Sequence, residues 1–144
     1  MTGGVAENSV VLSEDLSPVV KLFSPIRRSN KDGKDCYELL VTEQHLNKAG
    51  TFHGGFYCTV FDIAMGSTAT DSIDSIKKIA TVNLNVSLIR AAFQGDTLNI
   101  RVSLLRKTER LIYLSAEMFS KESLLANATS TIYYVANERI SQAL

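Results

Sequence analysis

The sequence lacks most of the residues from which proteins build metal sites and disulfides. It has no Trp, two Pro, two Cys and two His among 144 residues. Cys36 and Cys58 do not form a CxxC pair, and His45 and His53 are the only histidines, so we expect no metal site and no cofactor. We also expect the two cysteines to be reduced thiols rather than a disulfide.

An excess of charge and a long apolar run are missing too. The 15 basic and 15 acidic residues cancel, which argues against binding to nucleic acid or to an anionic membrane. No stretch reaches about 18 apolar residues, so no membrane-spanning helix is predicted. The N-terminus has no basic segment before an apolar run and contains Glu7, Glu14 and Asp15, which predicts a cytoplasmic protein. A mitochondrial location stays open as the alternative, without a clear presequence.

What is present fits one globular domain. At 45% hydrophobic residues the chain can bury a core. Residues 1–15 are predicted to form a flexible arm and residues 16–144 a single domain. The segment 18–28 is expected to hold a short helix or an edge strand, because a proline inside it cannot donate to a central ladder. Asp32-Gly33 predicts a hairpin turn before a strand at 36–42.

A change of pattern marks the segment from Gly54 to Thr70. It has no proline and is too long for one strand without a turn, which predicts a helix that ends before the polar loop 71–78. This helix is apolar almost all round. We therefore expect it to be buried, with a curved antiparallel sheet as the surface that covers it.

Four strand patterns follow the predicted helix. Residues 81–88 alternate strictly, which places Val82 with Leu84, Val86 and Leu88 on one predicted face and Thr81 on the other. Three further strands, joined by short polar turns, are predicted at 97–105, 111–120 and 124–135. Because strands and helices do not alternate along the chain, the predicted class is α+β rather than α/β.

Asp62 is the only carboxylate between residues 49 and 70. An unpaired buried carboxylate is costly, so it is neutralised, hydrogen-bonded or kept for a purpose. If Asp62 is desolvated, its pKa is raised and it can serve as a general base. The alternative is a structural one, in which Asp62 lies on an exposed stripe or pairs with a distant Lys.

The residues His53-Gly54-Gly55 open the same helix. The first turn of a helix has free N–H groups and the positive end of the dipole, and glycine allows a ligand oxygen to approach them closely. The pattern is therefore suited to stabilising an oxyanion during acyl transfer. A loop-anchoring role for His53 and an ordinary helix cap are the competing interpretations.

The spacing of Gly54 and Asp62 adds a constraint. Eight residues at about 1.5 Å each separate them by roughly 12 Å along one helix. One reacting carbonyl cannot touch both groups of the same chain. We therefore expect a dimer in which two antiparallel helices meet about a two-fold axis and share two equivalent sites.

At this point the residues resemble a known family. The segment His45-Leu46-Asn47-Lys48-Ala49-Gly50-Thr51-Phe52-His53-Gly54-Gly55, followed by Asp62, is similar to the signature of hotdog-fold thioesterases of the phenylacetate-degradation type. The branch it resembles most is that of the eukaryotic thioesterase superfamily member two, also called acyl-coenzyme A thioesterase thirteen. The resemblance covers about residues 34–135. It implies a hotdog fold, an antiparallel β-sheet around one long central helix.

The resemblance also implies a reaction, the hydrolysis of acyl-coenzyme A without a metal. By that similarity Asn47 and the Gly54 amide would polarise the thioester carbonyl, with His53 nearby. Asp62 from the other subunit would activate water or attack directly. The family has a Ser on the strand after the helix where this chain has Thr81, which still offers a hydroxyl.

The substrate-binding residues are also implied by the resemblance. Two segments, 88–96 and the turn 106–111, correspond to segments that line the coenzyme A nucleotide in relatives, and their basic side chains would neutralise phosphates. Ordinary solvated turn charges are the alternative for each. The predicted substrate-binding residues are Gly55, Arg90, Ala91, Arg106, Lys107, Thr108 and Arg110. The predicted assembly is a homodimer or a tetramer made of two dimers.

Three other functions are alternatives to acyl-coenzyme A hydrolysis. A hydratase or dehydratase needs an acid–base pair, and no His follows Asp62 in the chain. A non-catalytic acyl-coenzyme A-binding or assembly module on the same scaffold stays open because of Thr81. A serine or cysteine hydrolase lacks support, because there is no G-x-S-x-G motif and Cys58 has no second His near it in the sequence.

Overall fold

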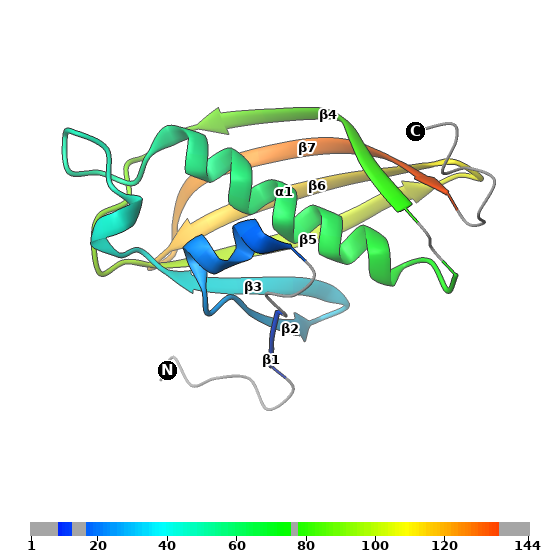
Figure 1. The fold of residues 1–144 in the computed structure, drawn as a ribbon, viewed down its shortest axis with the longest axis horizontal. Coiled ribbons are helices and arrows are strands. Elements are labelled where there is room, and N and C mark those ends of the chain that lie inside the picture. The colour runs from blue at the N-terminus through cyan, green and yellow to red at the C-terminus, as the bar shows by residue number, and fades with distance from the viewer. Residues whose placement is uncertain (1–8, 13–16, 76–77, 136–144) are drawn as a thin grey trace.

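The computed structural model describes residues 9–12, 17–75 and 78–135. In these residues seven antiparallel strands form one sheet in the order β1-β2-β3-β5-β6-β7-β4, and one long helix lies across its face (Figure 1). The predicted α+β class is confirmed. The elements are β1 (Val10–Val11), η1 (Pro18–Phe23), β2 (Arg27–Lys31), β3 (Lys34–Leu40), η2 (Glu43–His45), α1 (Gly54–Asp71), β4 (Lys78–Leu88), β5 (Thr97–Lys107), β6 (Leu111–Ser120) and β7 (Ser123–Val135).

The N-terminal part of the chain contains a short strand within the predicted arm. Much of the expected arm, residues 1–8 and 13–15, lies outside the described residues, but Val10–Val11 pairs with β2 as a short edge strand. The segment 18–28 contains both predicted alternatives, a 3-10 helix and the start of a strand. The predicted turn at Asp32-Gly33 is confirmed, with φ values of 52° and 80°.

The long helix α1 begins at Gly54 as predicted and ends at Asp71. Its buried residues recur every three or four positions, so one stripe packs on the sheet. The expected burial against the sheet holds for this stripe, whereas the opposite side of the helix, with Asp62, Gly66 and Thr70, is only half-buried. The buried stripe consists of Tyr57, Val60, Phe61, Ala64, Met65, Thr68 and Ala69.

A β-bulge corrects the predicted alternation of β4. The register with β7 shifts between Thr81 and Asn83, so Val82 is the extra residue and is 60% exposed. A bulge re-aims the side chains on one side of it. Thr81 pairs with buried Ile132 and therefore faces α1 together with Leu84, whereas strict alternation had placed these two residues on opposite faces.

The strand β4 lies at an edge of the sheet. Its one neighbour among the described strands is β7, and its other side is unpaired along 11 residues (Figure 1). The opposite edge is the two-residue strand β1. In the described part of the chain, no helix is long and apolar enough to cross a membrane.

Candidate active site

The side chain of Asp62 meets a single polar partner across the gap between α1 and β4. The hydroxyl of Thr81 donates a hydrogen bond of 2.7 Å to Asp62 Oδ1. No Lys or Arg of the described residues forms a salt bridge with this carboxylate. The alternative in which Asp62 pairs with a distant Lys is therefore not supported. A hydroxyl beside a carboxylate that has no ion-pair partner can help to orient a water molecule.

Asp62 also lines a pocket of about 440 Å³ on the side of α1 that faces away from the sheet. This volume is within the usual range of small-molecule sites, about 300–1,000 Å³. The pocket lies between α1, η1 and the start of β4. Its lining residues are Leu12, Ser17, Val19, Val20, Asp62, Ile63, Gly66, Ser67, Thr70, Asp71 and Ile79.

The N-terminus of α1 offers one free backbone donor. His53 is the N-cap, and its Nδ1 accepts a 3.0 Å hydrogen bond from the Gly55 amide. The Gly54 amide has no hydrogen-bond partner among the described residues. An added Cβ at Gly54 would lie 3.3 Å from Leu88 Cδ1, so this turn lies against the end of β4. His53 thus caps the helix, which is the competing interpretation of its role, and the Gly54 N–H is left as a backbone donor at the helix start.

The Asn47 side chain forms hydrogen bonds within its own loop. Its Oδ1 accepts the amides of Ala49 and Thr51 at 3.0 Å, and its Nδ2 donates to Thr51 Oγ1 at 2.9 Å. These bonds hold the loop that leads into α1. One Nδ2–H is left over for a substrate, so Asn47 positions the loop first and has limited capacity to polarise a carbonyl.

His45 has a purely structural environment. It is 2% exposed, its Nδ1 accepts the Thr42 amide at 2.9 Å, and its Nε2 bonds the carbonyl of Leu22 at the end of η1. Its ring also stacks on Phe23. The histidine therefore fastens η1, one wall of the pocket, to the loop before α1.

The residues predicted to bind the nucleotide fall into two groups that lie far apart in one chain. The Tyr57 hydroxyl donates to the Arg90 carbonyl and accepts from the Ala92 amide, both at 3.1 Å, so Arg90 and Ala91 lie near the start of α1. Burial raises the pKa of Tyr57. The other group lies past the end of α1, where Lys107 Nζ donates to the Ser72 carbonyl at 2.9 Å.

The second group belongs to the β5–β6 connection. Arg106 and Lys107 end β5, which extends the strand predicted at 97–105 by two residues. Thr108 Oγ1 accepts the Leu111 amide at 3.0 Å and orders the turn, while Arg110 is exposed. One chain therefore does not bring both predicted nucleotide-binding groups to one place.

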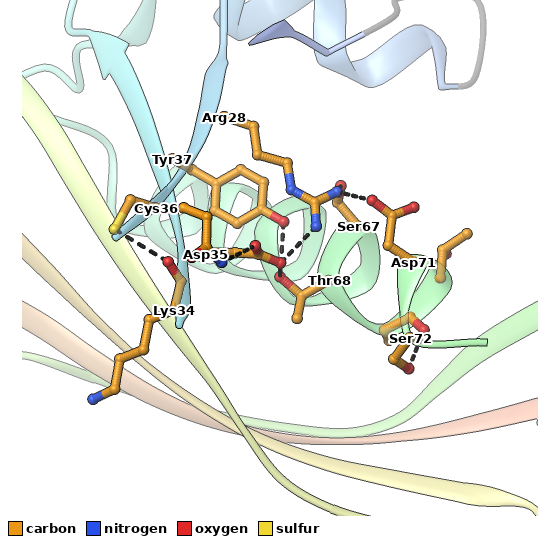
Figure 2. A network of polar contacts seen from close by, with 12 residues as sticks. Arg28, Lys34, Asp35, Cys36, Tyr37, Ser67, Thr68, Asp71 and Ser72 are labelled. Carbon is orange, nitrogen blue, oxygen red and sulfur yellow. Dashed lines mark hydrogen bonds and ion pairs between the residues drawn. The ribbon is translucent and has the colours of Figure 1, made fainter. Parts of the chain in front are cut away.

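A polar network that the sequence did not predict lies at the far end of the pocket (Figure 2). Arg28 of β2 donates to Asp35 Oδ2 at 2.5 Å, to Ser67 Oγ at 3.1 Å, and to Asp71 Oδ2. Burial lowers the pKa of Arg28, but Tyr37, Asp35 and Asp71 outweigh this and raise it overall. The network fixes the second half of α1 to β2 and β3.

Tyr37 and Thr68 complete this network from the buried side. The Thr68 hydroxyl donates to Asp35 Oδ2 at 2.8 Å and meets the Tyr37 hydroxyl at 2.8 Å (Figure 2). Burial raises the pKa of Tyr37 to about 12. Asp35 is half-buried and accepts hydrogen bonds from Arg28 on one side and Thr68 on the other. A carboxylate is tolerated at a buried position when its oxygens have such donors.

The pocket residues beyond Asp62 were missed from the sequence. Asp62, Gly66 and Thr70 recur every four positions and share one helix side, which is a readable signal. No sequence pattern indicates that Val19 and Val20 line the pocket, because tertiary packing of η1 brings them to α1. No group of three or more His, Cys, Asp and Glu suited to a metal occurs among the described residues.

Comparison with known proteins gives the family. Residues 49–126 match the family model described as thioesterase superfamily. A candidate esterase of Pseudomonas aeruginosa is 28% identical, over 81% of this chain and 88% of its own. Mouse acyl-coenzyme A thioesterase 13 is 29% identical, over 58% of this chain and 59% of its own.

Solved structures agree on the fold. A phenylacetic acid degradation-related protein from Ralstonia eutropha superposes with a TM-score of 0.75 at 24% identity, over 83% of this chain and 90% of that one. At this identity the likeness shows the fold alone. The match over residues 49–126 includes α1, Asp62 and Thr81, and more than half of the sequence. The chain therefore belongs to the thioesterase superfamily and has the hotdog fold of its phenylacetate-degradation-type members.

Proposed function

We propose that the protein is an acyl-coenzyme A thioesterase whose general base is Asp62. The observation that carries the proposal is the 2.7 Å bond from Thr81 to Asp62 at the edge of the pocket. The bulge in β4 directly after Thr81 puts the Thr81 side chain on the face of the strand that meets α1. Coenzyme A as the thiol is supported by the mouse relative, which carries acyl-coenzyme A thioesterase in its name.

In the proposed reaction, Asp62 and Thr81 hold a water molecule beside the thioester. Asp62 takes a proton as the water oxygen bonds the carbonyl carbon. The negative charge that develops on the carbonyl oxygen is stabilised by a Gly54 amide. When the C–S bond breaks, the proton passes from Asp62 to the coenzyme A sulfur. The products are the free acid and the thiol, and Asp62 is again a carboxylate.

The Gly54 amide in this reaction comes from a second subunit. Gly54 and Asp62 lie on one helix, about 12 Å apart at 1.5 Å per residue, as the sequence predicts. The unpaired edge of β4 offers the means to bring a second chain, because an 11-residue exposed edge is a template for strand pairing. Val82 and Leu88 on this strand are 60% and 53% exposed.

The register of such a pairing follows from the side-chain contacts. Thr81 contacts Asp62, and Leu88 lies against Gly54 of the same chain. We infer that two β4 strands pair antiparallel, with Asn85 opposite Asn85 of the second copy. Because Val82 is an extra residue in the bulge, Thr81 then lies opposite Leu88 of the second copy. Asp62 of each chain then faces the helix start of the other. The proposed unit is a homodimer with two shared sites, and a tetramer of two such dimers keeps both.

The test is the hydrolysis of acyl-coenzyme A thioesters by Asp62→Asn. We expect kcat to fall by about a hundredfold to ten-thousandfold, the range for a positioned general base. The control is Asp74→Asn, an exposed carboxylate just past α1, which should keep the wild-type rate. Unchanged turnover of Asp62→Asn contradicts the mechanism. A wild-type protein that binds acyl-coenzyme A without turnover instead supports the acyl-binding module.

A further inference from the structure

The pocket beside Asp62 has two chemically different ends. Along α1 it runs from Asp62 past Gly66 to Asp71, which is about 13 Å at 1.5 Å per residue. The middle is walled by apolar side chains, Val19 and Val20 from η1 and Ile79 from β4. If Asp62 serves the thioester, as proposed above, the acyl tail has this space to enter.

The far end presents hydrogen-bond acceptors rather than a closed apolar floor. Asp71 uses Oδ2 for Arg28, and its Oδ1 has no partner among the described residues (Figure 2). The Thr70 hydroxyl donates its proton to the Gly66 carbonyl at 2.9 Å, so its oxygen is left as an acceptor. A ligand group that reaches this end is matched when it donates a hydrogen bond.

Two carboxylates and one arginine meet at the far end, and Lys107 Nζ lies nearby against the Ser72 carbonyl. The single positive charge of Arg28 is shared between two carboxylates, Asp35 and Asp71. Among the described residues that line the pocket there is no Lys or Arg, and Asp62 adds a further negative charge at the other end. An acyl tail that ends in a carboxylate would place like charges together, which costs binding energy.

The pocket is open at Asp71, whose side chain is 61% exposed, so its length gives the reach from Asp62 to Asp71 rather than an upper limit on the acyl chain. An extended chain advances roughly 1.3 Å per carbon, given C–C bonds of about 1.5 Å. About ten carbons therefore reach from a thioester at Asp62 to Asp71. We propose that, among acyl groups of this length, the pocket selects those that end in a hydroxyl and rejects those that end in a carboxylate. Asp71 is then the specificity-determining residue. This proposal rests on the proposed function and deepens it.

The experiment compares three ten-carbon acyl-coenzyme A thioesters, which end in a methyl, a hydroxyl or a carboxylate. For the wild type we expect kcat/KM for the hydroxyl chain to exceed that for the methyl chain by about fivefold, the worth of one partly solvated hydrogen bond. The carboxylate chain should be about tenfold or more below the methyl chain. In Asp71→Asn, which keeps the shape and an acceptor oxygen but removes the charge, the difference between the carboxylate and methyl chains should shrink to within about twofold.

A matched control variant and a binding measurement distinguish failure of the proposed function from failure of the specificity inference. Asp74→Asn removes an exposed carboxylate outside the pocket and should leave all three ratios unchanged. Equilibrium binding of the same thioesters to Asp62→Asn measures the pocket without hydrolysis. Binding in the expected order with no wild-type turnover overturns the proposed function and keeps this inference. A wild type that prefers the methyl chain in both readouts, or a ratio of the carboxylate to the methyl chain that Asp71→Asn does not change, overturns the inference.

Discussion

At the scale of single residues, the pair formed by Asp62 and Thr81 decides what the site can do. The sequence singled out Asp62 as the one carboxylate in an apolar helix, and the structure gives it one hydroxyl partner at 2.7 Å. The departure from Ser to Thr at residue 81 does not remove the hydroxyl from the site. The Thr81 side chain lies on the same strand face as Ile79, which lines the pocket, and Leu84.

Thr81→Val tests this pair with almost no change of shape. The valine keeps the volume but cannot donate to Asp62, so we expect kcat to fall about tenfold, the lower end for a hydrogen bond to a charged group. Thr81→Ser should keep most of the activity. Thr129→Val, an exposed residue on neighbouring β7, is the control. Equal kcat values for Thr81→Val and the wild type would show that the hydroxyl has no role in turnover.

At the scale of elements, the network around Arg28 joins β2, β3 and α1. Tyr37 is its most buried member, at 1% exposure, and the raised pKa of about 12 comes mainly from that burial. A phenol with a pKa higher in the folded chain than its usual value of about 10 stabilises the fold while it is neutral. This contribution is complete below about pH 10 and is lost as the pH rises through 12.

Tyr37→Phe is the variant that tests this pH dependence. We expect the wild type to lose roughly 2 kcal/mol of unfolding free energy between pH 9 and 12 through this group, since each pKa unit is worth about 1.4 kcal/mol. The variant should lose less over the same interval, although at pH 7 it is about 1 kcal/mol less stable without the bond to Thr68. Urea unfolding at several pH values measures both. Parallel pH curves would contradict the assignment.

At the scale of the whole molecule, the proposed function depends on a second copy of the chain. In the proposed dimer each site takes Asp62 from one subunit and the Gly54 amide from the other. A monomer then has both groups but no place where one carbonyl meets them. We therefore expect activity to require the dimer.

Mixing two inactive variants tests the shared site. Gly54→Pro removes the amide proton at the first helical position, where proline is tolerated, and Asp62→Asn removes the base. After unfolding and refolding together at equal amounts, about half of the dimers are mixed, and each has one intact site. About a quarter of the wild-type activity should return. Gly54→Ala keeps the amide and is the control for the added side chain. No recovery from a mixture that forms mixed dimers would contradict the shared site.

A cross-link tests the proposed register of the two β4 strands. Asn85 would lie on the two-fold axis, opposite its own copy, at a Cα separation of about 5 Å that a disulfide can bridge. Asn85→Cys should therefore give a covalent dimer on mild oxidation, as seen on a non-reducing gel. Asn127→Cys, an exposed residue on β7, one strand inward from the edge, should stay monomeric on that gel, as should the wild type with its free Cys36 and Cys58. Equal cross-linking of both variants would exclude this register.

The sequence by itself determined the helix from Gly54, the class of the fold and the prominence of Asp62. These depend on local pattern, on helix length and on the rarity of charge, all of which are present in the chain before it folds. The helix ends one residue later than predicted, and the strands that follow it begin and end within a few residues of the predicted bounds.

Only the tertiary structure decided which face of β4 meets α1, and what surrounds Asp62. The bulge between Thr81 and Asn83 is set by pairing with β7, and no alternation pattern announces it. Likewise Arg28, Asp35 and Asp71 are distant in sequence and meet only because β2 and β3 pack beside the end of α1. The pocket exists between elements rather than within one, so packing alone fixes its walls and its polar end.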